Sequence, residues 1–330
     1  GLNSTALGVD TVASGDRASA IGGTASATGT FSTALGNLAS ATGGSATALG
    51  FSAEATRSGS TAIGAGADAT GGESTALGAN SRATGSRAIS LGASTNSSGI
   101  GSIAIGGDRG DADAFGAQDT NTDSIAIGGE ALDNALSSVS IGSASSATAL
   151  GSLAIGGDGD DIDALGARAI GSLSTAVGAD AVASLNSASA FGSDANASDS
   201  FSTAIGSQSE AQGLSTVALG ALARATSDFA TAVGTASVAS GEISSAFGLQ
   251  SSASGDEAIA LSYLARASGD RSISLGSQSE ASASGTIAIG GDAGDGDVLG
   301  AQAIAQDATA VGSDSVASGL SAAAFGTGTL

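Results

Sequence analysis

The side chains in this sequence that are best suited to bind a metal ion are carboxylates in three related, glycine-rich segments, 107–116, 157–166 and 291–300. Calcium takes six to eight oxygen ligands, and clustered Asp with flexible Gly could supply them. The order of residues matches neither the EF-hand loop nor the calcium-binding nonapeptide, so a solvated acidic turn is the favoured interpretation and no metal is predicted. The candidate ligands, should calcium bind, are Asp108, Asp111 and Asp113; Asp158, Asp161 and Asp163; and Asp292, Asp295 and Asp297.

The first of these segments also contains a tripeptide that many integrins bind, Arg109-Gly110-Asp111. A chain rich in Gly and Asp produces this tripeptide by chance, and the two sister segments lack the Arg. These three residues are therefore candidate ligand-binding residues, with chance occurrence as the favoured explanation.

Composition excludes several classes of chemistry. The 330 residues contain no Cys, His or Lys and carry a net charge of −22. Thiol chemistry and the usual zinc, triad and His-based general-base sites are therefore absent, and no cofactor is predicted. Such acidity repels nucleic acid and anionic membranes. No apolar run approaches the roughly 20 residues that span a bilayer.

The segments that would position the three acidic loops repeat at a fixed interval. A glycine that follows a large apolar residue recurs every 14 residues, as at Gly8, Gly22 and Gly36, except for three 22-residue intervals that contain the acidic segments. So short and regular an interval is typical of a solenoid. We predict one elongated body over residues 1–330, with about 22 coils and the loops inserted at single turns. We expect the strands beside each loop to be intact, and Phe115, Leu165 and Leu299 to pack back on the body as apolar feet.

Each coil is numbered here from its repeat glycine as position zero. Positions three and five hold small residues, such as Ala39 and Ala41, whereas position four accepts either charge, as in Glu54 and Arg82. This alternation predicts a strand with one inward and one solvated face. A second strand precedes the next repeat glycine, as in residues 60–63. Glycine at positions zero and seven indicates turns that need a positive φ or close backbone stacking.

The second strand is apolar or small on both faces, as expected of a parallel strand packed between two layers. The other strand of the coil covers one face, and a two-strand coil has nothing left to cover the face that carries Thr and Ile. We therefore predict that copies of the same chain cover it in a cyclic assembly. Phe191, Phe247 and Phe325 stand in the same aliphatic column and are expected to fill the core, whereas Ser262 replaces a repeat glycine and, with Tyr263, is expected to mark a local irregularity.

The unit Ser-Thr-Ala-Leu-Gly, two variable residues and Ala-x-Ala-Thr-Gly, as in residues 32–43, resembles the head repeat of trimeric autotransporter adhesins, the YadA-like head. The resemblance covers essentially the whole chain. It implies an all-β, left-handed parallel β-roll assembled as a homotrimer. It also implies extracellular display on the outer membrane of a Gram-negative bacterium, through stalk and anchor segments that this sequence lacks, with no direct membrane contact by the head.

The function that this resemblance implies is attachment to host extracellular matrix proteins, cell-surface receptors or other surfaces. A repetitive flank favours many weak contacts over one pocket. The repeat is in phase at both ends, so the sequence is interpreted as a fragment of a longer chain.

Other functions remain open. A ladder of Thr, as at Thr33, Thr47 and Thr61, could order water, which would indicate an ice- or crystal-binding solenoid. Calcium-clamped loops would instead indicate a calcium-stabilised structural spacer. No enzyme is predicted, because left-handed β-helix acyltransferases rely on a six-residue unit and a His, and the carboxylates here lie on projecting loops without an aromatic sugar platform.

Overall fold

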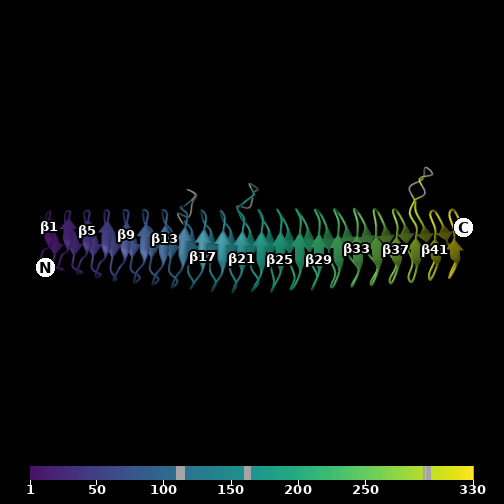
Figure 1. Cartoon of the computed structure of the whole chain (residues 1–330), viewed down its shortest axis with the longest axis horizontal. Coiled ribbons are helices and arrows are strands. Elements are labelled where there is room, and N and C mark those ends of the chain that lie inside the picture. The colour runs from purple at the N-terminus through teal and green to yellow at the C-terminus, as the bar shows by residue number, and fades with distance from the viewer. Residues whose placement is uncertain (109–115, 160–164, 293, 295–298, 330) are drawn as a thin grey trace. The chain divides into compact units, whose positions relative to one another are not determined.

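The structure is a computed structural model that describes residues 1–108, 116–159, 165–292, 294 and 299–329. The chain divides into two compact units, residues 1–173 and 174–330. Within the described ranges each unit consists of strands and turns without a helix (Figure 1). The prediction of one body over residues 1–330 stays a prediction.

Three-residue and two-residue strands alternate along the first unit. Its three-residue strands are Thr5–Leu7 (β1), Ser19–Ile21 (β3), Thr33–Leu35 (β5), Thr47–Leu49 (β7), Thr61–Ile63 (β9), Thr75–Leu77 (β11), Ile89–Leu91 (β13), Ile103–Ile105 (β15), Ile125–Ile127 (β17), Val139–Ile141 (β19) and Leu153–Ile155 (β21). Its two-residue strands are Val12–Ala13 (β2), Ser26–Ala27 (β4), Ser40–Ala41 (β6), Glu54–Ala55 (β8), Asp68–Ala69 (β10), Arg82–Ala83 (β12), Asn96–Ser97 (β14), Gln118–Asp119 (β16), Leu132–Asp133 (β18), Ser146–Ala147 (β20) and Arg168–Ala169 (β22).

The second unit has the same alternation. Its three-residue strands are Thr175–Val177 (β23), Ser189–Phe191 (β25), Thr203–Ile205 (β27), Val217–Leu219 (β29), Thr231–Val233 (β31), Ser245–Phe247 (β33), Ile259–Leu261 (β35), Ile273–Leu275 (β37), Ile287–Ile289 (β39), Thr309–Val311 (β41) and Ala323–Phe325 (β43). Its two-residue strands are Val182–Ala183 (β24), Asn196–Ala197 (β26), Glu210–Ala211 (β28), Arg224–Ala225 (β30), Val238–Ala239 (β32), Ser252–Ala253 (β34), Arg266–Ala267 (β36), Glu280–Ala281 (β38), Gln302–Ala303 (β40) and Val316–Ala317 (β42).

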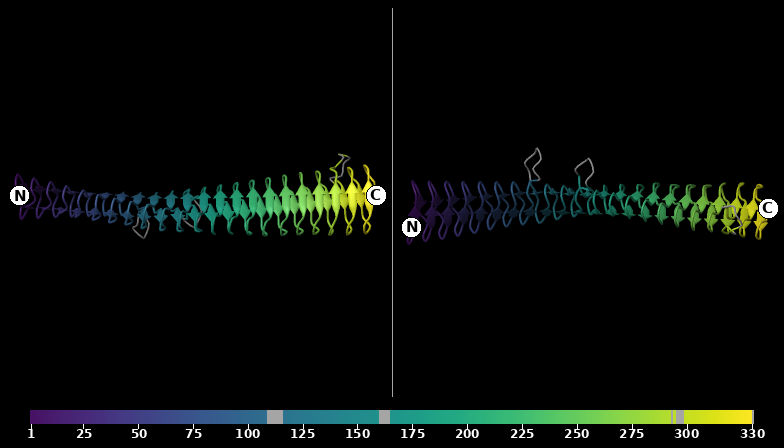
Figure 2. Two further views of the ribbon diagram at one scale, coloured as in Figure 1. Left: turned by 60° about the horizontal axis from the view of Figure 1, so that its bottom comes forward. Right: turned by 90° about the horizontal axis from the view of Figure 1, so that it is seen from above.

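Each unit contains two parallel sheets, one for each class of strand. Within each unit, strands pair with the equivalent strands of the neighbouring coils, so that Thr33 lies beside Thr47 and Ser40 beside Glu54. Figure 2 shows the coils of each unit following one another as stacked loops. The predicted parallel β-solenoid of 14-residue, two-strand coils is confirmed.

The interior between the two sheets of each unit is built from small side chains, mostly alanine with serine and a few threonines. Positions three and five of one strand and ten and twelve of the other point inward, as Ala39, Ala41, Ala46 and Ala48 do, and all four are fully buried. Every buried hydrophobic side chain among the described residues is Ala, and the largest fully buried side chain is Thr95. The sheets therefore lie too close together for Leu, Ile or Phe to enter, and these larger side chains remain on the outside.

The first turn of the coil requires glycine for its backbone conformation. The repeat glycines have φ values such as 139° at Gly36 and 135° at Gly64, a region that side-chain-bearing residues rarely adopt. Ser262 adopts this conformation with a φ of 129° and keeps the usual hydrogen bond to the preceding coil, from its N–H to Phe247 O at 2.8 Å. The expected local irregularity at Ser262 and Tyr263 is therefore wrong, because the serine accepts the glycine geometry.

The second turn of the coil favours glycine for a different reason, although some coils accept a larger residue there, as at Arg57 and Leu185. The glycines at position seven, such as Gly29 and Gly85, do not have a positive φ, but a Cβ on either would overlap the carbonyl oxygen of the glycine one coil further along. Close backbone stacking, one of the two predicted causes, is confirmed here. Serine at position ten supports the turn, since Ser32 Oγ donates to Gly29 O at 2.7 Å and Ser74 Oγ to Gly71 O at 2.8 Å.

Candidate functional site

The described ends of the three acidic loops share one geometry. At the outgoing end, the N–H groups of Asp108, Asp158 and Asp292 donate to the preceding coil at 3.2 to 3.3 Å. At the returning end, Gly116, Gly166 and Gly300 do the same at 3.0 to 3.2 Å. A Cβ on any of these glycines would crowd two backbone carbonyl oxygens. Each insertion is therefore closed at its base by backbone hydrogen bonds.

The strands beside each loop keep their register, as predicted. Asn96 of β14 pairs with Gln118 of β16, Ser146 with Arg168, and Glu280 with Gln302. Of the predicted apolar feet, Leu165 and Leu299 are partly covered, at 41% and 43% exposed, and their packing on the body stays a prediction. Phe115 lies outside the described residues.

Most of the predicted ligand residues also lie outside the described residues. They are Arg109, Gly110, Asp111 and Asp113, then Asp161 and Asp163, and finally Asp295 and Asp297. Among the residues that are described, no three acidic side chains lie together in a way that could hold a metal ion. Asp292 Oδ1 instead accepts the N–H of Gly294 at 2.7 Å. The calcium hypothesis and the tripeptide hypothesis both stay predictions.

The three-residue strands present a ladder of Thr and aliphatic side chains on the outer face of their sheet. Positions eleven and thirteen point outward in each unit, and Leu35, Leu49, Ile205 and Leu219 are 38% to 42% exposed. The chain itself does not cover this face, as the sequence predicts. Phe191, Phe247 and Phe325 belong to the same column and remain 38%, 36% and 67% exposed, so none of them fills the interior between the two sheets of its unit. Their burial against other copies of the chain stays a prediction.

The outer face of the two-residue strands includes charged side chains, such as Glu54 and Arg266. Position four points outward, and side chains of opposite charge in neighbouring coils form ion pairs there. Arg224 lies 3.1 Å from Glu210, and Arg82 lies 3.8 Å from Asp68. The two outer faces of each unit thus differ in character, one being aliphatic with Thr and the other polar and charged.

Two buried carboxylates occur where the neighbouring coils place small side chains. Asp119 and Asp133 are fully buried, and they stack between Ser97 and Ala147 along the two-residue strands. Asp119 accepts hydrogen bonds from the Ser124 hydroxyl and from the N–H of Ile103 at 3.1 Å. Asp133 accepts one from the Ser138 hydroxyl, while its Oδ2 has no partner among the described residues.

Burial raises the pKa of Asp119 to about 6, although the hydrogen bonds from Ser124 and Ile103 lower it. Burial raises the pKa of Asp133 as well, against the hydrogen bond from Ser138. Both residues lie at position five, where the other coils have a small residue such as Ala41. Sequence reasoning missed them because it compared position five only in coils that have a small residue there. Extending the comparison through the first 22-residue interval to the next coil would have found them.

Comparison with known families decides where this repeat belongs. The family described as "YadA head domain repeat (2 copies)" matches residues 1–23, 13–39, 41–67, 69–95, 83–108, 134–158, 169–193, 186–209, 211–237, 239–261, 267–293 and 303–329. The chain belongs to the YadA head family. The resemblance of residues 32–43 to this repeat is thereby confirmed, and the family is one of non-enzymatic adhesin domains.

Among solved structures, this YadA head is similar to the crystal structure of the collagen-binding domain of the Yersinia adhesin YadA. The two share 27% sequence identity over 43% of this chain and 67% of that chain, with a TM-score of 0.31. No curated protein matches the chain. Over the described part of this YadA head, no helix is long and apolar enough to cross a membrane.

Proposed function

We propose that this chain is the head of a surface adhesin. In this proposal three copies assemble as a homotrimer of left-handed parallel β-rolls, displayed outside a Gram-negative bacterium through segments that anchor it in the outer membrane. The head then attaches the cell to host extracellular matrix proteins, cell-surface receptors or other surfaces. Membership of the YadA head family supports this function.

The observation that carries the proposal is the repetition of the outer surface from coil to coil. Each parallel pairing places equivalent outward residues of neighbouring coils side by side, as for Asp68 beside Arg82 and Thr61 beside Thr75. Neighbouring parallel strands lie about 4.8 Å apart. A ligand that is itself extended or repetitive can therefore make the same weak contact many times, and its affinity comes from their number.

Attachment of cells that display the full chain and variants shortened by whole coils tests this function. We expect attachment to surfaces coated with collagen, fibronectin or laminin to weaken progressively as more coils are removed, because each coil contributes a similar share. Cells that display no head serve as the control. Loss of all attachment on removal of one coil without an inserted loop would contradict the proposal, since it would indicate a single local site.

Ice or crystal binding is the second candidate, and one observation favours it. Thr33, Thr47, Thr61 and Thr75 form an unbroken column on a face that the chain itself does not cover. Isoleucine replaces threonine in this column at Ile89 and Ile103, so the regular row of threonines ends there. Thermal hysteresis measured on the purified chain near the freezing point would support this candidate, and its absence would exclude ice binding.

A further inference from the structure

Arg57 stands where the coils on either side of it have a close-packed glycine. It lies at position seven, which Gly43 and Gly71 occupy in those coils. The N–H groups of Gly43 and Gly71 donate to Ala55 O at 3.4 Å and Ala83 O at 3.2 Å, respectively. In the coil of Arg57, the equivalent acceptor is Ala69 O, which accepts the Thr56 N–H at 3.2 Å. Among the described residues, the Arg57 N–H makes no bond to this oxygen. Gly85 likewise makes no such second bond within the described ranges, and a Cβ on Gly43 would lie 2.0 Å from Arg57 O, so the coil accepts the larger residue and keeps its close stacking.

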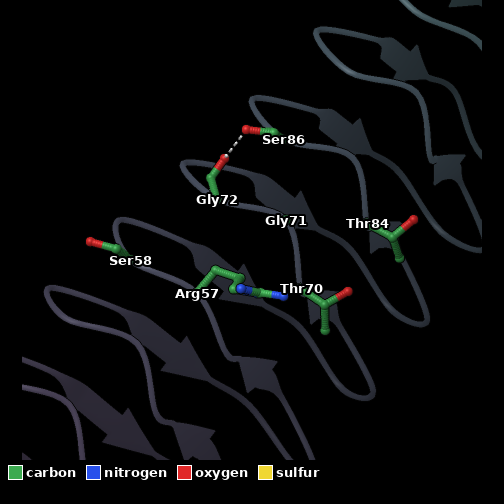
Figure 3. A pocket seen from close by; sticks show the side chains of 7 residues that line it. All are labelled: Arg57, Ser58, Thr70, Gly71, Gly72, Thr84 and Ser86. Carbon is green, nitrogen blue, oxygen red and sulfur yellow. Dashed lines mark hydrogen bonds between the residues drawn. The ribbon is translucent and has the colours of Figure 1, made fainter.

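An open trough of about 520 Å³ lies beside this turn. Figure 3 shows the Arg57 side chain extended toward Thr70, with Thr84 one coil further along and Ser58 and Ser86 at the rim. Its volume is within the range of natural small-ligand sites, which is about 300 to 1,000 Å³. The trough is wide open to solvent, so a ligand of one or two rings that bound there would stay partly exposed.

The polar groups that line the trough are available to a ligand. Within the part of the chain that the structure describes, the Arg57 guanidinium has no ion-pair partner, and the hydroxyls of Thr70 and Thr84 make no hydrogen bond. Ser86 Oγ donates to Gly72 O at 3.3 Å, and its lone pairs remain able to accept. The site thus presents one planar cation beside a row of hydroxyl groups.

The charge around the trough differs from that of the whole chain. Residues 50–99 contain Arg57, Arg82 and Arg87 against Glu54, Asp68 and Glu73, so this stretch is neutral while the chain carries −22. A single anionic group can approach Arg57 without strong local repulsion. A polyanion is disfavoured, because its further charges would meet the acidic remainder of the protein.

We propose that the Arg57 trough binds a sugar acid, a polyhydroxylated ring that carries one carboxylate, as found at the ends of glycan chains. The guanidinium pairs with the carboxylate through two parallel N–H···O bonds, a geometry that arginine favours. The hydroxyls of Thr70, Thr84 and Ser86 bond the ring hydroxyls. This proposal rests on the proposed attachment function, and it names sugar acids as the ligand class of the Arg57 trough.

The test measures saturation-transfer NMR of the full chain with N-acetylneuraminic acid, with neutral N-acetylglucosamine and heparin as comparison probes. Arg57→Gln removes the charge and keeps a side chain, and Arg57→Gly restores the residue of the neighbouring coils, so both variants should fold. Arg87→Gln is the matched control, because Arg87 is an exposed arginine two coils further along that does not line the trough.

We expect both Arg57 variants to weaken binding of the sugar acid at least about tenfold, since a charge-assisted hydrogen bond is worth about 1.5 to 3 kcal/mol. Arg87→Gln should leave binding unchanged, and the acid should bind more strongly than N-acetylglucosamine and heparin. Equal binding by all variants, or stronger binding of either comparison probe, overturns the proposal. If the Arg57→Gln variant no longer binds the sugar acid while cells that display it still attach to matrix proteins, both proposals stand.

If the parent chain does not bind the sugar acid but cells that display it attach to matrix proteins, the sugar-acid proposal fails and the attachment function stands.

Discussion

Ser262 holds a backbone conformation that glycine holds in the other coils. Its φ of 129° lies in a region where a Cβ atom costs about 1 to 3 kcal/mol. The surrounding coils impose this conformation, because the hydrogen bonds from the Ser262 N–H to Phe247 O and from Ala265 N to Ser262 O match those of the regular turns. Ser262 is therefore a strained residue within an otherwise regular coil.

We expect Ser262→Gly to raise the free energy of unfolding by about 1 kcal/mol, since it removes this strain. Ser207→Gly is the matched control, because Ser207 follows a repeat glycine and does not have a positive φ. That change should be neutral or destabilising by about 0.5 kcal/mol, as expected of added glycine. Denaturant unfolding of the two variants and the parent measures the difference, and a destabilised Ser262→Gly would contradict the argument.

The buried pair Asp119 and Asp133 predicts a dependence of stability on pH. Because the pKa of Asp119 is raised from 3.8 to about 6, the folded chain binds this proton more tightly than the unfolded chain does. The free energy of unfolding therefore falls as the pH rises from about 4 to about 6, and it stays lower at pH 7. For Asp119 the loss is on the order of 3 kcal/mol. Asp133, whose pKa is also raised by burial, contributes with the same sign.

Replacing both residues with alanine should make the chain more stable at pH 7.5 and flatten its stability between pH 4 and pH 7. Ser124 and Ser138 keep their hydrogen bonds to Asn121 O and Ala135 O, so the double variant leaves no hydroxyl without a partner. Melting temperatures measured across this pH range provide the test, with the exposed Asp194→Ala as control. A double variant less stable than the parent at pH 7.5 would show that the pair stabilises the fold.

At the scale of the elements, the close approach of consecutive turns limits which residues the coil accepts. We predict that Gly85→Ala lowers the free energy of unfolding by about 1 to 3 kcal/mol, the usual cost of overpacking, because its Cβ would overlap Gly99 O. Gly44→Ala should leave stability unchanged or slightly raised, since its Cβ would find its nearest neighbour, Ser58 Oγ, at 3.8 Å. Equal effects of the two substitutions on the denaturation midpoint would contradict the stacking argument.

The strands and the two glycine columns could be predicted because each depends on a residue type that recurs at one position, as Ala39 and Ala41 do. The left-handed backbone at positions two and nine could not, since residues as different as Phe31 (φ 60°) and Ile243 (φ 58°) occupy it. Hydrogen bonds to neighbouring coils fix that conformation whatever the side chain. Of the candidate site, the insertion points and intact registers were predictable. The Arg57 trough was not, because several residue types replace glycine at position seven, as Leu185 and Asp199 also do, and the sequence does not show which of them lines a trough.

For the whole molecule, the exposed aliphatic ladder predicts self-association. Burying the exposed part of a side chain such as Leu219 or Leu261, each 42% exposed, would contribute roughly 1 kcal/mol per residue, repeated over many coils. We expect Leu219→Asp to weaken or abolish the assembly of the purified chain. Ser252→Asp should leave it unchanged, because position four accepts acidic residues in other coils, as at Glu210 and Glu280.

Sedimentation analysis together with circular dichroism measures this association. The parent chain should sediment as a trimer, and the Leu219→Asp variant as smaller species or as unfolded chain. A parent chain that sediments as a well-folded monomer at low concentration would contradict both the prediction and the proposed trimer.

The interior of small side chains has a consequence for how such a chain can evolve. Because successive coils present nearly the same inward side chains, a genetic duplication or deletion that spans whole repeats joins two surfaces that already fit each other. Most proteins that lose an internal segment must rebuild a hydrophobic core around the gap. Here unequal recombination between repeats can lengthen or shorten the gene product in steps of 14 residues, and natural selection can act on its reach without disturbing its packing.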